Sequence, residues 1–168
     1  KLTAAVNISG KQFNQDKIVD VIKKCISDTK VNPKYLELEL TESIIMKDVD
    51  RTINLFNKFK KMGISISIDD FGTGYSSLSY LKEFPIDRLK IDQSFISNIT
   101  DENSSDAEIA NLVIDLGHKL GLEVIAEGVE TKEQINFLRK YACDQIQGFV
   151  LSKPVTIEKF ETLLEKKY

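Results

Sequence analysis

Short β-branched segments alternate with segments of helical period along the whole chain, and this alternation constrains the fold more than any other feature. Residues 35–41 read YLELELT and residues 64–69 read ISISID, both of which are typical of strands. Between them, residues 48–62 place apolar side chains at helical spacing and stop before Gly63. The 168 residues hold six such units of about 28 residues each. Alternation of this kind predicts a parallel sheet with right-handed crossovers.

The same criteria predict one strand and one helix in each unit. Strands are expected over residues 4–9, 35–41, 64–69, 86–92, 122–126 and 145–151, and helices over 16–27, 48–62, near 78, over 106–120, after 131 and around 157–164. Two helices carry candidate capping boxes, Ser105 with Glu108 and Thr131 with Gln134. No linker separates dissimilar halves, so we expect a single domain over residues 1–168.

Two observations favour a barrel over a doubly wound sheet, which remains the alternative. No GxGxxG or GxxxxGK[ST] motif follows the first predicted strand. Polar residues recur at the end of every predicted strand, whereas a doubly wound sheet gathers them at one switch point. A full (β/α)8 barrel takes about 250 residues. We therefore expect an α/β fold, an incomplete TIM-like (β/α) barrel of about six β/α units.

Composition excludes several classes of protein. The net charge is −3, whereas a protein that binds duplex nucleic acid needs a basic surface, so such a partner is not expected. No apolar run approaches the roughly 20 residues that span a bilayer, so no membrane segment is expected in this chain. Cys25 and Cys143 lack metal-binding spacing and are expected to be free thiols in a reducing compartment, which predicts a cytoplasmic domain.

Residues able to perform chemistry stand at the end of each predicted strand. They are Asn7 and Ser9, Glu39 and Glu42, Asp69 and Asp70, Lys90 and Asp92, Glu127 and Glu130, and Gln145 and Gln147. The ends of parallel strands meet at one rim, where unpaired carboxylates are costly to bury without a cation. Carboxylate and amide oxygens, with no imidazole or thiolate among them, favour Mg²⁺ or Mn²⁺ over zinc.

The adjacent pair Asp69 and Asp70 carries the sharpest prediction of this set. One of these carboxylates can bridge two metal ions while the other binds only the second. Two metal ions about 3.5–4 Å apart are a recurrent device for hydrolysing phosphodiesters. Lys90 would then add a fixed positive charge beside the attacking water or the developing negative charge. The spacing of these residues predicts metal-assisted phosphoester chemistry.

A glycine- and serine-rich segment follows the acidic pair. It comprises Phe71, Gly72, Thr73, Gly74, Tyr75, Ser76 and Ser77. The glycines permit sharp turning, and the two serines are candidate caps for the next helix. Its position predicts a mobile loop that completes the site or reports on it. Phe149, beside the last predicted strand end, is a candidate surface for stacking a base.

Six segments, in this order, resemble the later motifs of the EAL-domain cyclic di-GMP phosphodiesterases. They are VNIS, ELTES, IDDFGTGYSSL, LKID, VIAEGVE and QIQGFVLSKP. The resemblance covers essentially the whole chain. It implies a modified (β/α)8 barrel in which one strand runs antiparallel, and hydrolysis of cyclic di-GMP to linear pGpG with Mg²⁺ or Mn²⁺.

The resemblance also implies roles for individual residues. Asn7, Glu42 and Asp69 would bind one metal ion, and Asp69 would bridge to a second ion held by Asp70 and Glu127. Lys90, Gln147 and Glu127 would be catalytic residues. Glu130 would anchor the loop that begins at Phe71. The substrate-binding residues would be Asp92, Phe149 and Pro154. In active family members that loop couples metal binding to dimerisation, so a homodimer is expected.

The Glu-Ala-Leu motif that names the family is absent from the chain. We expect it upstream of Lys1, together with two strands, a ligand glutamate and an arginine. On that expectation the chain is a partial EAL domain with impaired activity, and it associates through unpaired strand edges. Two other functions remain open, a non-catalytic cyclic di-GMP receptor and an enolase-type Mg²⁺ barrel that uses Lys90 as its base.

Overall fold

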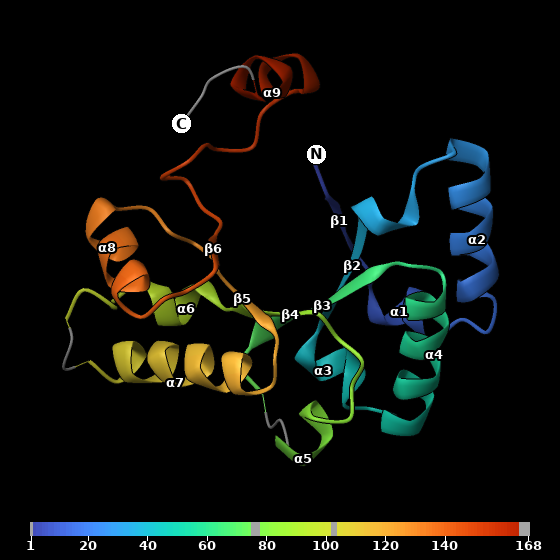
Figure 1. Cartoon of the computed structure of the whole chain (residues 1–168), viewed down its shortest axis with the longest axis horizontal. Helices are drawn as coiled ribbons and strands as arrows, with labels where there is room; N and C mark the ends of the chain where they lie inside the picture. The colour runs from blue at the N-terminus through green and yellow to red at the C-terminus, as the bar shows by residue number, and fades with distance from the viewer. Residues whose placement is uncertain (1, 75–77, 102–103, 165–168) are drawn as a thin grey trace.

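Six parallel strands form one sheet, and they follow each other in the sheet in the order in which they follow each other in the chain. The structure is a computed structural model that describes residues 2–74, 78–101 and 104–164. The order β1-β2-β3-β4-β5-β6 contains no reversal (Figure 1), which confirms a barrel-like sheet and excludes the doubly wound alternative. Within these residues β1 pairs only with β2 and β6 only with β5, so the sheet stays open.

The elements agree with the predicted alternation. The strands are β1 (Ala4–Asn7), β2 (Leu36–Thr41), β3 (Ser65–Phe71), β4 (Arg88–Ile91), β5 (Glu123–Ala126) and β6 (Gln145–Ile146). The longer helices are α2 (Ile18–Thr29), α4 (Val49–Lys61), α7 (Ser105–Lys119), α8 (Lys132–Lys140) and α9 (Ile157–Leu164). Short helices are α1 (Gly10–Phe13), the 3-10 turn Pro33–Tyr35, α3 (Glu42–Ile45), α5 (Leu78–Leu81) and α6 (Gln93–Ile96).

The two faces of the sheet differ in polarity because side chains alternate along each strand. In β2, Leu38 and Leu40 are buried on one face, while Glu37 and Glu39 occupy the other. The register carries this division across the sheet. The polar face therefore also receives Ser67 and Asp69 of β3, Arg88 and Lys90 of β4, and Glu123 of β5. In a barrel, such a face points into the interior.

Helices cover the apolar face and form the core with it. Phe56 and Phe59 of α4 are fully buried with Ile66 and Ile68 of β3. Farther along the sheet, α7 packs against β4 and β5, and Gly117 permits a close approach of this helix to Val124. A Cβ added at Gly117 would lie 2.3 Å from Val124 Cγ2. Core packing thus fixes the apolar face and leaves the polar face for the site.

Several predicted boundaries are corrected by the structure. The sixth strand was expected over residues 145–151, but β6 spans only Gln145–Ile146, because the chain turns at Gly148. Helix α7 is capped by Ser104, whose hydroxyl accepts from the Ala107 N–H, so the predicted Ser105 capping box is wrong. The Thr131 capping box of α8 is confirmed.

The last helix stands apart from the rest of the chain. Figure 1 shows α9 at the end of an extended stretch that leads away from the sheet. Ile157 is 74% exposed, and Phe160 and Leu164 are exposed as well, so the predicted apolar face exists but stays largely open to solvent. Among all the residues that the structure describes, no helix is both long and apolar enough to cross a bilayer.

Candidate metal centre at the strand ends

Lys90 stands at the centre of the polar face near the carboxyl ends of the strands. Its ammonium group lies 3.0 Å from Glu39 Oε1, 3.1 Å from Asp69 Oδ1 and 2.5 Å from Glu127 Oε1. The lysine side chain is only 3% exposed. Carboxylates from β2, from β3 and from the residue after β5 thus meet one cation carried by β4, as expected of converging strand ends.

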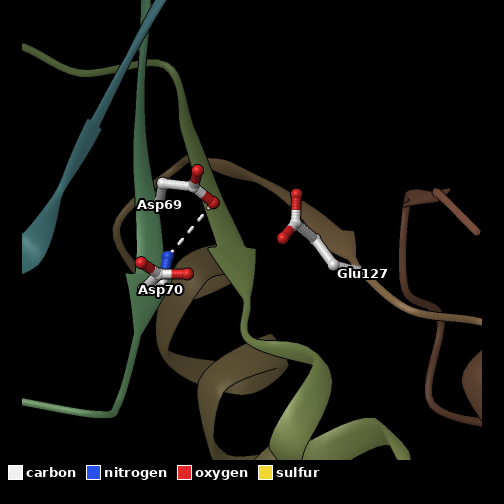
Figure 2. Close-up of side chains that lie close together, drawn as sticks. All are labelled: Asp69, Asp70 and Glu127. Atoms are coloured by element: carbon white, nitrogen blue, oxygen red, sulfur yellow. Dashed lines mark hydrogen bonds between the residues drawn. The ribbon is translucent and has the colours of Figure 1, made fainter. Parts of the chain in front are cut away.

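A bulge in β3 brings two adjacent carboxylates to this rim. The register between β3 and β4 shifts between Ile68 and Phe71, so Asp69 and Asp70 both oppose the part of β4 that contains Lys90. Asp70 adopts a left-handed backbone with φ 55°, which costs about 1 kcal/mol. Its N–H donates to Asp69 Oδ1 at 3.1 Å (Figure 2). The bulge replaces the usual alternation, which would turn the two side chains to opposite faces.

Asp69, Asp70 and Glu127 form a compact group of oxygen ligands. One carboxylate oxygen from each lies within 4.8 Å of the others, and Figure 2 shows the carboxyl groups of Asp69 and Glu127 turned toward one another. With Glu39, four carboxylates face the single ammonium of Lys90, so full ionisation leaves an excess of three negative charges. An oxygen-only donor set with this excess fits a divalent hard cation.

The pKa directions express the same crowding of charge. Burial, then repulsion from Asp69 and Asp92, raises the pKa of the Asp70 carboxyl. Burial also raises the pKa of Glu127, although its ion pair with Lys90 opposes the shift. Burial alone would lower the pKa of Lys90, but its hydrogen bond and ion pair with Glu127 and the other carboxylates raise it. Lys90 therefore remains charged, and the carboxylates gain from any further cation.

Glu42 occupies a different place from the one the sequence analysis gave it. It begins α3, is 2% exposed, and its Oε2 accepts from the Gly72 N–H at 3.0 Å. A Cβ added at Gly74 would lie 2.6 Å from Glu42 Oε1. Glu42 thus holds the glycine-rich loop, the role predicted for Glu130, while Glu39 stands in the carboxylate cluster in its place.

The strand pattern contained the signal for Glu39. In LELELT, Glu37 and Glu39 share the face that the register gives to Asp69, whereas Glu42 lies beyond the end of β2. Asn7, the last residue of β1, pairs in register with Glu39. Its amide is therefore carried beside Glu39.

The remaining predicted residues fall around the cluster. Glu127, Glu130, Gln147 and Phe149 line one cleft of about 190 Å³. Phe149 and Pro154 also line a groove with apolar residues of α9. Glu130 is exposed and its backbone N–H donates to Gln134 Oε1 at 2.7 Å.

On the β3 and β4 side, Asp92 caps α6 by accepting from the Ser94 N–H at 2.8 Å. Phe71 is the buried last residue of β3. The Thr73 hydroxyl donates to the Asp70 carbonyl at 2.8 Å. Tyr75, Ser76 and Ser77, which the sequence analysis also assigned to the loop, lie outside the described residues.

Comparison with known proteins gives one consistent result. The EAL domain family model matches residues 1–154. The cyclic di-GMP phosphodiesterase NbdA of Pseudomonas aeruginosa is 42% identical over 98% of this chain and 21% of its own length. The chain thus spans about a fifth of the length of the curated relatives it matches.

Solved structures agree with this fold. The PaMucR phosphodiesterase in its c-di-GMP complex has a TM-score of 0.91 and 42% identity, covering 94% of this chain and 70% of that one. The BlrP1 protein of Klebsiella pneumoniae, in a manganese/cy-diGMP complex, has a TM-score of 0.81 and 28% identity over 90% of this chain and 39% of that one.

Proposed function

The chain belongs to the EAL-domain family, and we propose that its protein hydrolyses cyclic di-GMP to linear pGpG at the rim that surrounds Lys90. The observation that supports this most is the meeting of Asp69, Asp70 and Glu127 within 4.8 Å beside a buried ammonium group. Relatives of similar sequence are named cyclic di-GMP phosphodiesterases. In the reaction, water adds across one phosphodiester bond, leaving a phosphate on the new 5′ end and a hydroxyl on the new 3′ end.

The proposed ligands follow from the positions of the carboxylates. Asn7, Glu39 and Asp69 would hold one Mg²⁺ or Mn²⁺, and Asp69 would share a second with Asp70 and Glu127. When bound, such a pair of ions lowers the pKa of a water molecule and neutralises charge on the phosphate. Glu39 takes the place first given to Glu42, because Glu39 lies 3.0 Å from Lys90 Nζ whereas Glu42 is engaged with Gly72.

The other side chains of the rim would orient water and substrate. Lys90 keeps its proton, since three carboxylates surround it, and it would donate to the attacking water or to a phosphoryl oxygen. Glu127 and Gln147, which line the same cleft, would hold the water in line with the scissile bond. Glu42 would anchor the loop beside Asp70.

The proposed substrate-binding residues lie at the edge of this rim. Phe149 is 54% exposed and offers a ring on which a guanine base can stack. Pro154 lines the adjoining groove, and Asp92 stands next to Asp70. Together these residues would bind the two nucleosides while the phosphate reaches the carboxylates.

Assembly and location form a further part of the proposal. We propose that the protein acts in the cytoplasm, where its free cysteines Cys25 and Cys143 remain reduced. We also propose self-association as a homodimer or through strand edges. The exposed apolar residues of β1 and α9 support this, among them Val6, Ile157 and Phe160.

Product analysis tests the proposed function. Cyclic di-GMP is incubated with the protein in Mg²⁺, in Mn²⁺ and with a chelator, and the nucleotides are separated by chromatography. We expect pGpG with either metal ion and none with the chelator. Calorimetric binding without turnover in both metals would favour a receptor instead. Activity on a carboxylate substrate with proton abstraction, and none on the dinucleotide, would favour the enolase-type alternative.

A further inference from the structure

Helix α6 begins directly between two loops of the site. It follows β4, and β4 lies between β3 and β5 in the sheet. Asp92 caps α6, and Phe95 follows within the same turn. Asp70 lies near the end of β3 and Glu127 directly follows β5, so α6 stands between the two residues proposed to share a metal ion.

On the β3 side, the ring of Phe95 supports the glycine-rich loop. A Cβ added at Gly72 would lie 3.0 Å from Phe95 Cε2, and Gly72 has φ +97°. From another side, the Gly72 N–H is held by Glu42. At the next residue, the Thr73 N–H and hydroxyl both donate to the Asp70 carbonyl. The position of Phe95 is therefore transmitted to the backbone of Asp70.

On the β5 side, the first residue of α6, Gln93, lies against the loop at Gly128. A Cβ added at Gly128 would lie 2.5 Å from Gln93 Cβ and 3.3 Å from Gln93 Cα. At this distance from Gln93, only a glycine fits at position 128, between Glu127 and Val129. The first turn of α6 thus limits how near Glu127 comes to β4.

The end of α6 is fastened to the same β5 loop. Gln134 Nε2 donates to the Ile96 carbonyl at 3.0 Å in a buried position. Gln134 Oε1 accepts from the Glu130 and Thr131 N–H groups at 2.7 and 3.0 Å. One side chain thus ties α6 to the segment that begins at Glu127. Ile96 is fully buried, so α6 does not shift independently of the core.

We propose that α6 is a spacer that fixes the separation of Asp70 and Glu127, with Phe95 and Gln134 as its positioning residues. Phe95 sets the β3 loop at Gly72, and Gln134 sets the β5 loop through the backbone of Glu130 and Thr131. This inference rests on the proposed function, because the separation matters only where both carboxylates hold one ion. Residues that orient metal ligands from behind typically change metal affinity 10- to 100-fold when removed.

The experiment measures binding of Mn²⁺ itself. The protein is titrated with Mn²⁺ alone, and the two ions are followed by electron paramagnetic resonance, in which neighbouring ions give a coupled spectrum. We expect Phe95→Ala and Gln134→Ala to bind the first ion as the unmodified protein does and the second about 10-fold more weakly. Phe95→Leu, which keeps most of the volume, should lie between Phe95→Ala and the unmodified protein.

Phe84→Ala is the matched control. Phe84 is 5% exposed and packs against Phe56 in the core, with ring centroids 5.9 Å apart. This variant loses an aromatic ring but should keep both binding constants for Mn²⁺. Circular dichroism confirms that each variant is folded. With saturating Mn²⁺, the kcat of Phe95→Leu should lie closer to that of the unmodified protein than the kcat of Phe95→Ala does.

Two results overturn the spacer. In the first, folded Phe95→Ala and Gln134→Ala bind both ions with unchanged affinity. In the second, Phe84→Ala weakens the second ion as much as they do. If the unmodified protein binds two ions and forms pGpG in either case, only the spacer fails. If the unmodified protein binds no Mn²⁺, the proposed function fails together with it.

Discussion

At the scale of single residues, Lys90 is the counter-charge that lets three carboxylates meet. Its three partners come from β2, from β3 and from the residue after β5. Removing one partner of a buried ion pair typically costs about 3–5 kcal/mol. A divalent cation bound by the same carboxylates supplies an alternative counter-charge. The stability of a Lys90 variant should therefore depend on metal more strongly than that of the unmodified protein.

Lys90→Met tests this counter-charge. In a chelator, the variant should lose about 3–5 kcal/mol of unfolding free energy, and saturating Mn²⁺ should restore a large part of the loss. Urea unfolding with and without Mn²⁺ measures both. Lys60→Met is the control, because the Lys60–Asp87 pair is about one-third exposed and such pairs contribute only about 1 kcal/mol or less. Equal responses of the two variants to Mn²⁺ would contradict the prediction.

Asp144 is a second residue with a testable electrostatic role. Burial opposes its ionisation, but hydrogen bonds from the Val124 N–H and from His118 outweigh burial and lower the pKa of Asp144. A carboxylate with a lowered pKa stabilises the fold above its unfolded pKa of about 3.9. That stabilisation is lost as the pH falls through the folded pKa.

Asp144→Asn should therefore be less stable than the unmodified protein at pH 6, and the difference should disappear at pH values below the folded pKa of Asp144. Urea midpoints across this range measure the difference. Asp115→Asn, an exposed aspartate on the same helix as His118, serves as the control. A difference for Asp144→Asn that stays constant down to pH 2 would argue against the assigned cause.

Residue types at the strand ends predicted most of the side chains at the rim, but not which glutamate of β2 and α3 joins the carboxylate cluster. Asp69, Asp70, Lys90 and Glu127 were predictable from strand ends. Residue type alone does not separate Glu39 from Glu42, whereas the alternation in LELELT does, because it places Glu39 on the face of Asp69 and leaves Glu42 beyond the end of β2. Both glutamates lie in the ELTES segment, and the resemblance to the family named Glu42 as the ligand.

At the scale of elements, contact between α7 and β5 depends on one missing side chain. Gly117→Ala would place a methyl group 2.3 Å from Val124 Cγ2, and overpacking of this kind costs about 1–3 kcal/mol. Val124→Ala in the same chain should relieve part of the cost. A double-mutant cycle in urea measures this coupling.

Gly10→Ala is the matched control for that cycle. Its Cβ would lie 3.4 Å from Ile44 Cγ1, an ordinary contact, so its stability should stay equal or rise by up to about 1 kcal/mol. Additive effects of Gly117→Ala and Val124→Ala would show that the two residues do not limit the approach of α7.

Element boundaries show where sequence patterns stop being informative. Thr131 and Gln134 form the predicted capping box, whereas α7 takes Ser104 in preference to its neighbour Ser105. Either serine satisfies the local pattern, and only the packed position of α7 selects one. Likewise, apolar residues after Gln145 suit a strand, but the chain turns at Gly148, whose carbonyl accepts from the Leu151 N–H.

At the scale of the whole molecule, the repeat of β/α units predicted both the parallel sheet and its sequential order. The periodicity did not predict how α9 lies, since an amphipathic helix has the same pattern whether or not its apolar face is covered. Ile157 and Phe160 are exposed and should promote association of this chain.

Light scattering of the 168-residue chain measures that association. We expect oligomers that Ile157→Glu combined with Phe160→Glu disperses, because charges on an apolar face prevent its burial. Lys159→Glu, on the same helix, should leave the oligomers unchanged. A monomer at every concentration, or oligomers that persist in the double variant, would refute this prediction.

The central claim is that the carboxylates around Lys90 carry metal-dependent hydrolysis of cyclic di-GMP. The most direct test is the rate of pGpG formation with saturating Mn²⁺ for the unmodified protein and for folded Asp69→Asn. We predict a loss of at least about 100-fold, which corresponds to about 2.7 kcal/mol of transition-state stabilisation. An unchanged rate in Asp69→Asn would contradict the claim.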